Sequence, residues 1–142
     1  MKKTFLLAMC VFLLGASTNA QKSEVVTAAQ VNGVWRYYNS DFRILALGHD
    51  KLKVQFNGQH MTRAGYPNLG EAMGEADIVG NVATFIPPDT HGCKITMTFL
   101  AGKLKVTQEG DDADCGFGHN VMATGTYRRT RAGKPKFISY PQ

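Results

Sequence analysis

The stretch from Cys93 to Tyr127 reads CKITMTFLAGKLKVTQEGDDADCGFGHNVMATGTY and carries the clearest secondary-structure signal in the chain. Apolar and polar residues alternate over 95–100 and again over 103–107, on either side of the pair Ala101-Gly102. Alternation with a period of two, interrupted by a two-residue turn that contains glycine, predicts an antiparallel hairpin. The core of the protein is therefore expected to be built from β-strands.

A cysteine lies near each connection of this stretch. Cys93 shares its parity with the apolar residues of the first strand, and Cys115 stands in a glycine-rich corner before a third strand, expected over His119 to Arg129. A disulfide between the two cysteines is predicted, because paired cysteines in an exported chain are normally oxidised. It would close a loop of about twenty residues, which corresponds to about 3 kcal/mol of chain entropy.

The start of the chain has the pattern of a secretory signal peptide. Lys2 and Lys3 precede an apolar run over 4–14, and small residues follow up to Ala20, after which cleavage is expected. The apolar run is shorter than the ~20 residues of a membrane-spanning helix. A lipoprotein signal that uses Cys10 is the alternative. The mature protein is therefore predicted to be periplasmic or secreted, with no stable membrane insertion.

The formal net charge of the 142 residues is +5, and removal of Lys2 and Lys3 leaves +3 on the mature chain. Basic residues are concentrated near the C-terminus: Arg128, Arg129, Arg131, Lys134 and Lys136. This end is expected to be a solvated tail, with contact to an anionic surface or an acidic partner as the alternative. Nucleic acid is not expected as a partner of an exported protein.

Five further strands are expected upstream of the hairpin. They are 31–38, 42–47, 51–56, 69–79 and 82–86. Residues 57–68 are expected to form a long loop, and 69–79 a bent or bulged strand, with a short helix over 70–76 as the alternative. Eight strands joined mostly by tight turns predict a small all-β, eight-stranded antiparallel up-and-down barrel. A two-sheet β-sandwich is the alternative.

The expected organisation follows from these assignments. It comprises a signal peptide (1–20), a lead-in with one helical turn (21–30), a β-barrel domain (31–129) and a basic tail (130–142).

Residues that could support catalysis or metal binding are scattered along the chain. The histidines at 49, 60, 91 and 119 show no ligand spacing, so no metal site or cofactor is expected. The acidic turn 110–114 lacks the register of a calcium loop. Candidate acid–base pairs are Glu71 with Glu75 and Glu109 with Asp112, and an enzymatic alternative uses His60, His91 and Asp114. No catalytic residue is assigned, and the protein is predicted not to be an enzyme.

Aromatic residues are numerous enough to fill a small barrel. If the barrel were instead hollow, a cavity for a small apolar ligand would be lined by Trp35, Tyr37, Phe56, Phe85 and Phe99.

Two resemblances to known families extend this interpretation. Gly33-Val34-Trp35 at the start of a strand is similar to the Gly-x-Trp motif of lipocalins, and to the start of avidins, in which the tryptophan plugs one end of the barrel. Residues 80–128, and more loosely the chain from Gly33, resemble a group of small exported bacterial proteins, some of which are lysozyme-inhibitor-like. Several inhibitors insert a Ser-Gly-x-Tyr or Ser-Gly-x-x-Tyr loop into the lysozyme active site, and Thr124-Gly125-Thr126-Tyr127 is similar to it, with threonine in place of serine.

The resemblance implies a non-enzymatic binding protein that blocks a lysozyme or another cell-wall hydrolase by occluding its cleft. The residues expected to bind are His119, Thr124, Gly125, Thr126, Tyr127 and Arg128. The alternative is a lipocalin-like or avidin-like carrier, whose partner would be a small apolar ligand.

Overall fold

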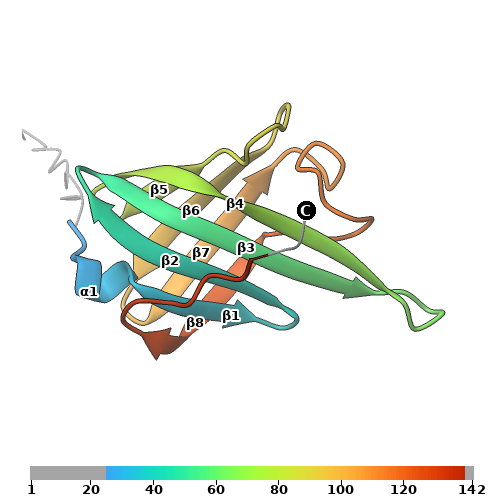
Figure 1. Ribbon diagram of the computed structural model, residues 1–142, viewed down its shortest axis with the longest axis horizontal. Coiled ribbons are helices and arrows are strands. Elements are labelled where there is room, and N and C mark those ends of the chain that lie inside the picture. The colour runs from blue at the N-terminus through green and yellow to red at the C-terminus, as the bar shows by residue number, and fades with distance from the viewer. Residues whose placement is uncertain (1–24, 140–142) are drawn as a thin grey trace, which may run out of the picture.

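Eight antiparallel strands close into an up-and-down barrel in the computed structural model, which describes residues 25–139 (Figure 1). The strands are β1 (Gly33–Tyr37), β2 (Ser40–Gly48), β3 (Lys51–Met61), β4 (Pro67–Val79), β5 (Val82–Phe85), β6 (Lys94–Leu100), β7 (Lys103–Glu109) and β8 (Gly125–Ala132). Each strand pairs with its neighbour in sequence, and β8 pairs with β1. The predicted barrel is thereby confirmed, and the sandwich is not. The expected signal peptide lies outside the described residues.

The hairpin predicted around Ala101-Gly102 is present and is formed by β6 and β7. Its register places Met97 opposite Val106 and Phe99 opposite Leu104, and all four side chains are buried. The polar residues between them face outward, as the alternation requires. The hairpin therefore contributes one continuous apolar surface to the barrel interior.

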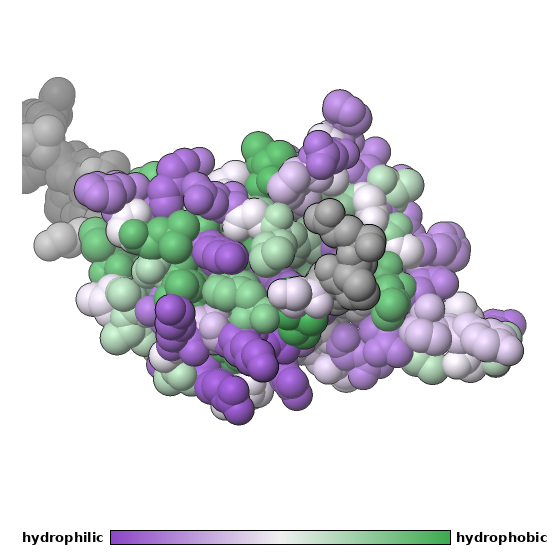
Figure 2. Space-filling model, in the orientation of Figure 1, coloured by the Kyte–Doolittle hydropathy of each residue, from purple (hydrophilic) through white to green (hydrophobic). Residues whose placement is uncertain are grey.

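The interval 57–68 is a projecting two-stranded ribbon and not the predicted loop. β3 and β4 stay paired from Lys51↔Asp77 to Met61↔Pro67, so only a short turn at 62–66 separates them. In Figures 1 and 2 this ribbon stands clear of the rest of the molecule. The predicted bulge or helix in 69–79 is also wrong, because the β3–β4 register has no shift.

Small residues on the inner face of β4 explain why this strand was misread. Gly70, Ala72, Gly74 and Ala76 point inward in turn, opposite the inward residues of β3. A Cβ atom added at Gly70 would lie 2.6 Å from the side chain of Val121, so glycine is required there by packing. These glycines make room for bulky neighbours and do not interrupt the strand.

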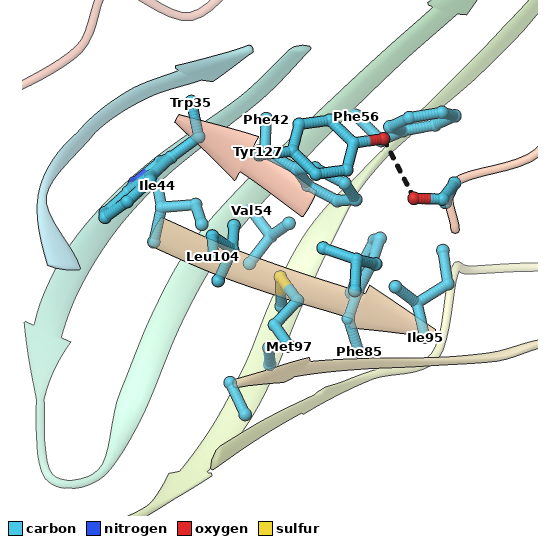
Figure 3. Close-up of a cluster of buried hydrophobic side chains, with 14 of the residues drawn as sticks. Trp35, Phe42, Ile44, Val54, Phe56, Phe85, Ile95, Met97, Leu104 and Tyr127 are labelled. Atoms are coloured by element: carbon cyan, nitrogen blue, oxygen red, sulfur yellow. Dashed lines mark hydrogen bonds between the residues drawn. The ribbon is translucent and has the colours of Figure 1, made fainter. Parts of the chain in front are cut away.

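The barrel interior is filled with apolar side chains, drawn in Figure 3. Phe42 packs against Phe56 with ring centroids 4.9 Å apart, and against Tyr127 at 5.0 Å. The Tyr127 hydroxyl donates a 2.8 Å hydrogen bond to the carbonyl of Ala123, so this buried polar atom has a partner. Burial raises the pKa of Tyr127, which therefore stays neutral.

One end of the barrel is closed by the short helix α1 (Ala28–Val31) and Trp35. The indole nitrogen donates to the carbonyl of Val31 at 3.0 Å, and the Arg129 guanidinium lies 5.5 Å from the ring centroid. Trp35 is 1% exposed and packs edge-on against Phe99. Within residues 25–139, no helix has the length and apolar character needed to cross a membrane.

The C-terminal segment is mostly exposed, as its composition predicted, but it is held against the barrel by hydrogen bonds. β8 continues to Ala132, and the chain then runs back over the outer face of β2 and β3 (Figure 1). The Gln55 side chain is fully buried there and exchanges two hydrogen bonds with the backbone of Ile138, at 2.7 and 2.8 Å. The backbone N–H and carbonyl of Ile138 thus satisfy both ends of the Gln55 amide, and the boundary predicted at residue 129 falls inside β8, which ends at Ala132. Residues 140–142 lie outside the described range.

Candidate functional site

The end of the barrel opposite α1 carries its longer connections. The β3–β4 ribbon, the β5–β6 loop (86–93) and the β7–β8 loop (110–124) all extend from this end, as does the short β1–β2 turn (38–39). The turns at the other end, by contrast, are tight. The longer connections are therefore gathered at one end of the barrel, and loops held on a scaffold are where binding residues are commonly found.

The β7–β8 loop plugs this end of the barrel. The predicted strand over 119–129 is wrong in its first part, since β8 begins only at Gly125. Phe117, Val121 and Ala123 of the loop are buried instead, and the Phe117 ring lies 5.0 Å from that of Phe56. The plug and the α1 end together leave an interior that is filled along its length.

The predicted disulfide is present and anchors the plug. Cys93 and Cys115 are bonded, with Cα atoms 4.8 Å apart, and both are buried. The bond joins the loop to the residue just before β6. The loop therefore cannot swing away from the barrel without taking the start of β6 with it.

Polar side chains shape the rest of the loop. The Gln108 amide reaches across its base: the nitrogen donates to the carbonyls of Gly110 and Asp111, and the oxygen accepts from the backbone N–H of Ala123 at 2.8 Å. The carboxylates of Asp111 and Asp114 each accept a backbone N–H from the other residue, at 2.8 and 3.0 Å. The acidic turn is therefore internally hydrogen-bonded.

Asp112 ties the acidic turn to the outer part of the loop. Its carboxylate accepts the backbone N–H of Asn120 at 2.5 Å and lies 3.4 Å from Nδ1 of His119, whose side chain is exposed. The hydrogen bond from Asn120 is the main reason why the pKa of Asp112 is lowered below its ordinary value of 3.8. The ionised form of Asp112 thus favours the folded loop.

We expect acid to weaken this part of the fold, and replacement of Asp112 by asparagine to reduce that pH dependence. A lowered folded-state pKa contributes stability that is present above the unfolded value and is lost as the pH falls through the folded value. The free energy of unfolding, measured in urea at several pH values from 5 down to about 2, should therefore fall less steeply in Asp112→Asn than in the wild type. Equal slopes for the two proteins would contradict this assignment.

The residues predicted to occlude a hydrolase cleft do not form one exposed loop. Tyr127 is fully buried, so it cannot enter a partner's active site. Gly125 is required because the Tyr37 ring lies where its Cβ would be, 2.5 Å away. Thr124 accepts a hydrogen bond from the backbone N–H of Gln108 at 3.0 Å. In this chain, Thr124, Gly125 and Tyr127 of the motif therefore have roles in packing and hydrogen bonding within the barrel.

Two other predicted residues do share a surface. Thr126 and Arg128 point outward from β8 and line a groove of about 410 Å³, which is completed by Arg36, Tyr37, Tyr38 and Lys103. His119 lies apart from this groove, on the loop at the barrel end. The groove was not found from the sequence, because its residues come from three strands.

The residues proposed to line a ligand cavity fill the barrel instead. Trp35, Phe56, Phe85 and Phe99 are at most 3% exposed and belong to one packed core. Tyr37 is 37% exposed and packs on the rim, with its ring 5.5 Å from that of Tyr127. These residues therefore do not surround a shared hollow.

The candidate catalytic and metal-binding residues are not brought together in the part of the chain that the structure describes. Over that part, no three histidine, cysteine, aspartate or glutamate side chains form a group that could hold a metal. Within 25–139, no hydrogen bond or ion pair joins His60, His91 and Asp114. The Asp114 carboxylate instead accepts the backbone N–H of Asp111 in the acidic turn. Glu71 and Glu75 both point outward from β4.

The ribbon tip is a second exposed feature, and sequence reasoning placed its residues on a long loop without predicting that the two strands stay paired. Large apolar side chains are displayed along it: Met61 is 46% exposed, Leu69 54% and Tyr66 74%. His60 and Arg63 are exposed beside them. Two hydrogen bonds between Thr62 and Tyr66 close the turn, one from the Thr62 N–H to the Tyr66 carbonyl and one from the Tyr66 N–H to the Thr62 hydroxyl.

Comparison of the chain with models of protein families, with curated proteins and with solved structures found no match. The resemblance of residues 80–128 to lysozyme inhibitors therefore stays a prediction.

Proposed function

We propose that the protein is a non-enzymatic binding protein that blocks a cell-wall hydrolase, such as a lysozyme, by inserting its β3–β4 ribbon into the substrate cleft. The observation that carries this proposal is the ribbon itself, which stays paired to Met61↔Pro67 and projects beyond the rest of the barrel (Figure 1). A paired ribbon loses little conformational entropy on binding, because its backbone is already ordered.

The chemistry of the ribbon tip suits a glycosidase cleft. Such clefts contain a pair of catalytic carboxylates, and Arg63 at the tip can offer a carboxylate two parallel hydrogen bonds. Met61 and Tyr66 beside it supply the apolar and aromatic contacts that commonly dominate protein interfaces. The inhibitor function predicted from the sequence is thus kept, but it is moved from residues 124–128 to residues 60–66.

The filled interior supports a surface-binding role over the carrier alternative. Phe56 touches both Phe42 on the barrel wall and Phe117 on the plug. A small apolar ligand would have to displace these rings, and closely packed cores resist such rearrangement.

The proposal is tested by the rate at which lysozymes clear a suspension of peptidoglycan. We expect the wild-type protein to slow at least one lysozyme of a panel that spans several structural classes. The double variant Arg63→Ala/Tyr66→Ala should weaken inhibition by about 30-fold or more, which corresponds to ~2 kcal/mol for hot-spot residues.

The matched control is Val79→Ala/Leu100→Ala. Both residues are exposed large hydrophobics, and they adjoin turns at the opposite end of the barrel. This control should inhibit as well as the wild type. If the wild-type protein slows no lysozyme, or if the tip variant inhibits as strongly as the wild type, the proposal is wrong.

A further inference from the structure

Charge is unevenly distributed over the strands of the barrel. β1 and β8 together carry four arginines and no carboxylate, whereas β4 carries three carboxylates and no basic residue. Figure 2 shows strongly hydrophilic residues along the edge where Figure 1 places β1 and β8. The face formed by β1 and β8 is therefore much more basic than the modest net charge of the whole chain indicates.

The register of the sheet concentrates this charge into one row. Lys103 of β7 lies directly opposite Arg128 of β8, and Arg128 lies directly opposite Arg36 of β1. All three side chains are exposed on the outer face. Adjacent strands are about 4.8 Å apart, so three cations stand side by side across the sheet. We call Lys103, Arg128 and Arg36 the cationic row.

The cationic row is not neutralised within the described chain. The next residue across the sheet from Arg36 is Asp41, but its carboxylate pairs with Arg43 at 3.2 Å and accepts a hydrogen bond from Asn57 at 3.1 Å. Over residues 25–139, none of the three row residues makes an ion pair with a carboxylate. Like charges placed directly opposite each other destabilise a sheet. The fold therefore carries two adjacent unfavourable cross-strand pairs that an anionic ligand would relieve.

Two tyrosines lie at one end of the row. Tyr37 and Tyr38 contact each other with ring centroids 4.6 Å apart, and Tyr38 is 89% exposed. Tyr38 has a φ of 47°, a left-handed conformation that is unusual for a bulky residue and that holds its ring at the β1–β2 turn. The two rings and the cationic row line the same groove of about 410 Å³.

We propose that this groove binds an acidic polysaccharide, that is, a chain of pyranose rings that bear carboxylate or sulfate groups. The cationic row would bind the charged groups, and the apolar face of a sugar ring would pack on Tyr38. A second groove shares Arg36 and is also lined by Val34, Arg43, Thr130 and Arg131, so there is room on this face for more than a single sugar. This surface is separate from the ribbon tip.

Binding is tested on the full mature chain by calorimetric titration with oligosaccharides of polygalacturonate and of heparin at physiological salt. Arg36→Gln/Arg128→Gln should lower the affinity by about tenfold or more. The same variant should raise the midpoint of thermal unfolding, because it removes the opposed like charges. Loss of binding together with a gain in stability is not expected from residues with a purely structural role.

The control Lys51→Gln/Lys94→Gln makes the same change in net charge. Both lysines are paired, with Asp77 at 2.5 Å and with Glu109 at 2.8 Å. This control should leave the affinity within about twofold of the wild type, because paired surface cations contribute little, and should not raise the midpoint. Tyr38→Ala should weaken binding of the oligosaccharides but not of poly-L-glutamate, which has carboxylates and no sugar ring.

Three outcomes would overturn the proposal. The first is that neither oligosaccharide binds saturably. The second is that the control loses as much affinity as Arg36→Gln/Arg128→Gln. The third is that poly-L-glutamate, duplex DNA or anionic vesicles bind as tightly as the oligosaccharides while Tyr38→Ala has no effect, which would assign the face to another class of anion.

Discussion

Replacing Phe56 with alanine is expected to lower the free energy of unfolding by about 3–5 kcal/mol. Phe56 is fully buried, and its ring contacts Phe42 at 4.9 Å and Phe117 at 5.0 Å. The substitution would therefore leave a cavity at the point where the wall of the barrel meets the plug. Neighbouring inward positions are small, since Gly58 and Gly70 have no side chain with which to fill the space.

Urea denaturation measures this loss. Tyr66→Ala is the matched control, because it also removes an aromatic ring from the β3–β4 hairpin but at a position that is 74% exposed. It should change the free energy of unfolding by no more than about 0.5 kcal/mol. A loss below about 1 kcal/mol for Phe56→Ala would be too small for a packed interior and would show that the barrel is not filled as described.

The double substitution Cys93→Ala/Cys115→Ala is expected to cost about 3 kcal/mol of unfolding free energy. The two cysteines are 22 residues apart in sequence, and the closed loop restricts the unfolded chain. The bond also holds the plug, so amide hydrogens in 110–124 should exchange faster with solvent in the variant than in the wild type.

Reduction provides an independent check. Under a thiol reductant, the wild-type protein should lose about the same unfolding free energy, whereas the variant should be unaffected by the reductant. If reductant leaves the stability of the wild-type protein unchanged under conditions that open the bond, the bond does not contribute to stability as described.

The β6–β7 hairpin shows what could be predicted from sequence. Its inward residues, Ile95, Met97 and Phe99, are large and alternate with threonines, and a glycine turn follows directly. Because the signal is local, both the strands and their register could be predicted. The cysteine pairing followed from the compartment that the predicted signal peptide implies, and the disulfide is present.

The β3–β4 ribbon shows where this reasoning failed. Gly70 and Gly74 were interpreted as irregularities, but they are inward positions that make room for Val121 and Phe85. The period-two alternation was present, with small residues inside and Glu71, Glu75 and Asp77 outside. The small size of the inward residues of β4 hid this alternation, because the side chains that fill the space beside them belong to other elements.

Long-range partners account for the remaining differences. Gln55 and Ile138 are 83 residues apart, and only the folded barrel brings them together. In the same way, Arg128 was a candidate binding residue from sequence, but its alignment with Lys103 and Arg36 depends on strand register. Tyr127 was chosen from a motif, and its alternation with Thr126 and Arg128 places it inside.

The barrel interior is filled by its own side chains, so a ligand would have to bind on the outer surface. Whether the interior is filled can be measured by titrating the folded protein with N-phenyl-1-naphthylamine, a neutral apolar dye that brightens on entering a cavity. We expect no saturable increase in fluorescence. A saturable increase at one dye molecule per protein would reveal an interior site and would show that the barrel is hollow.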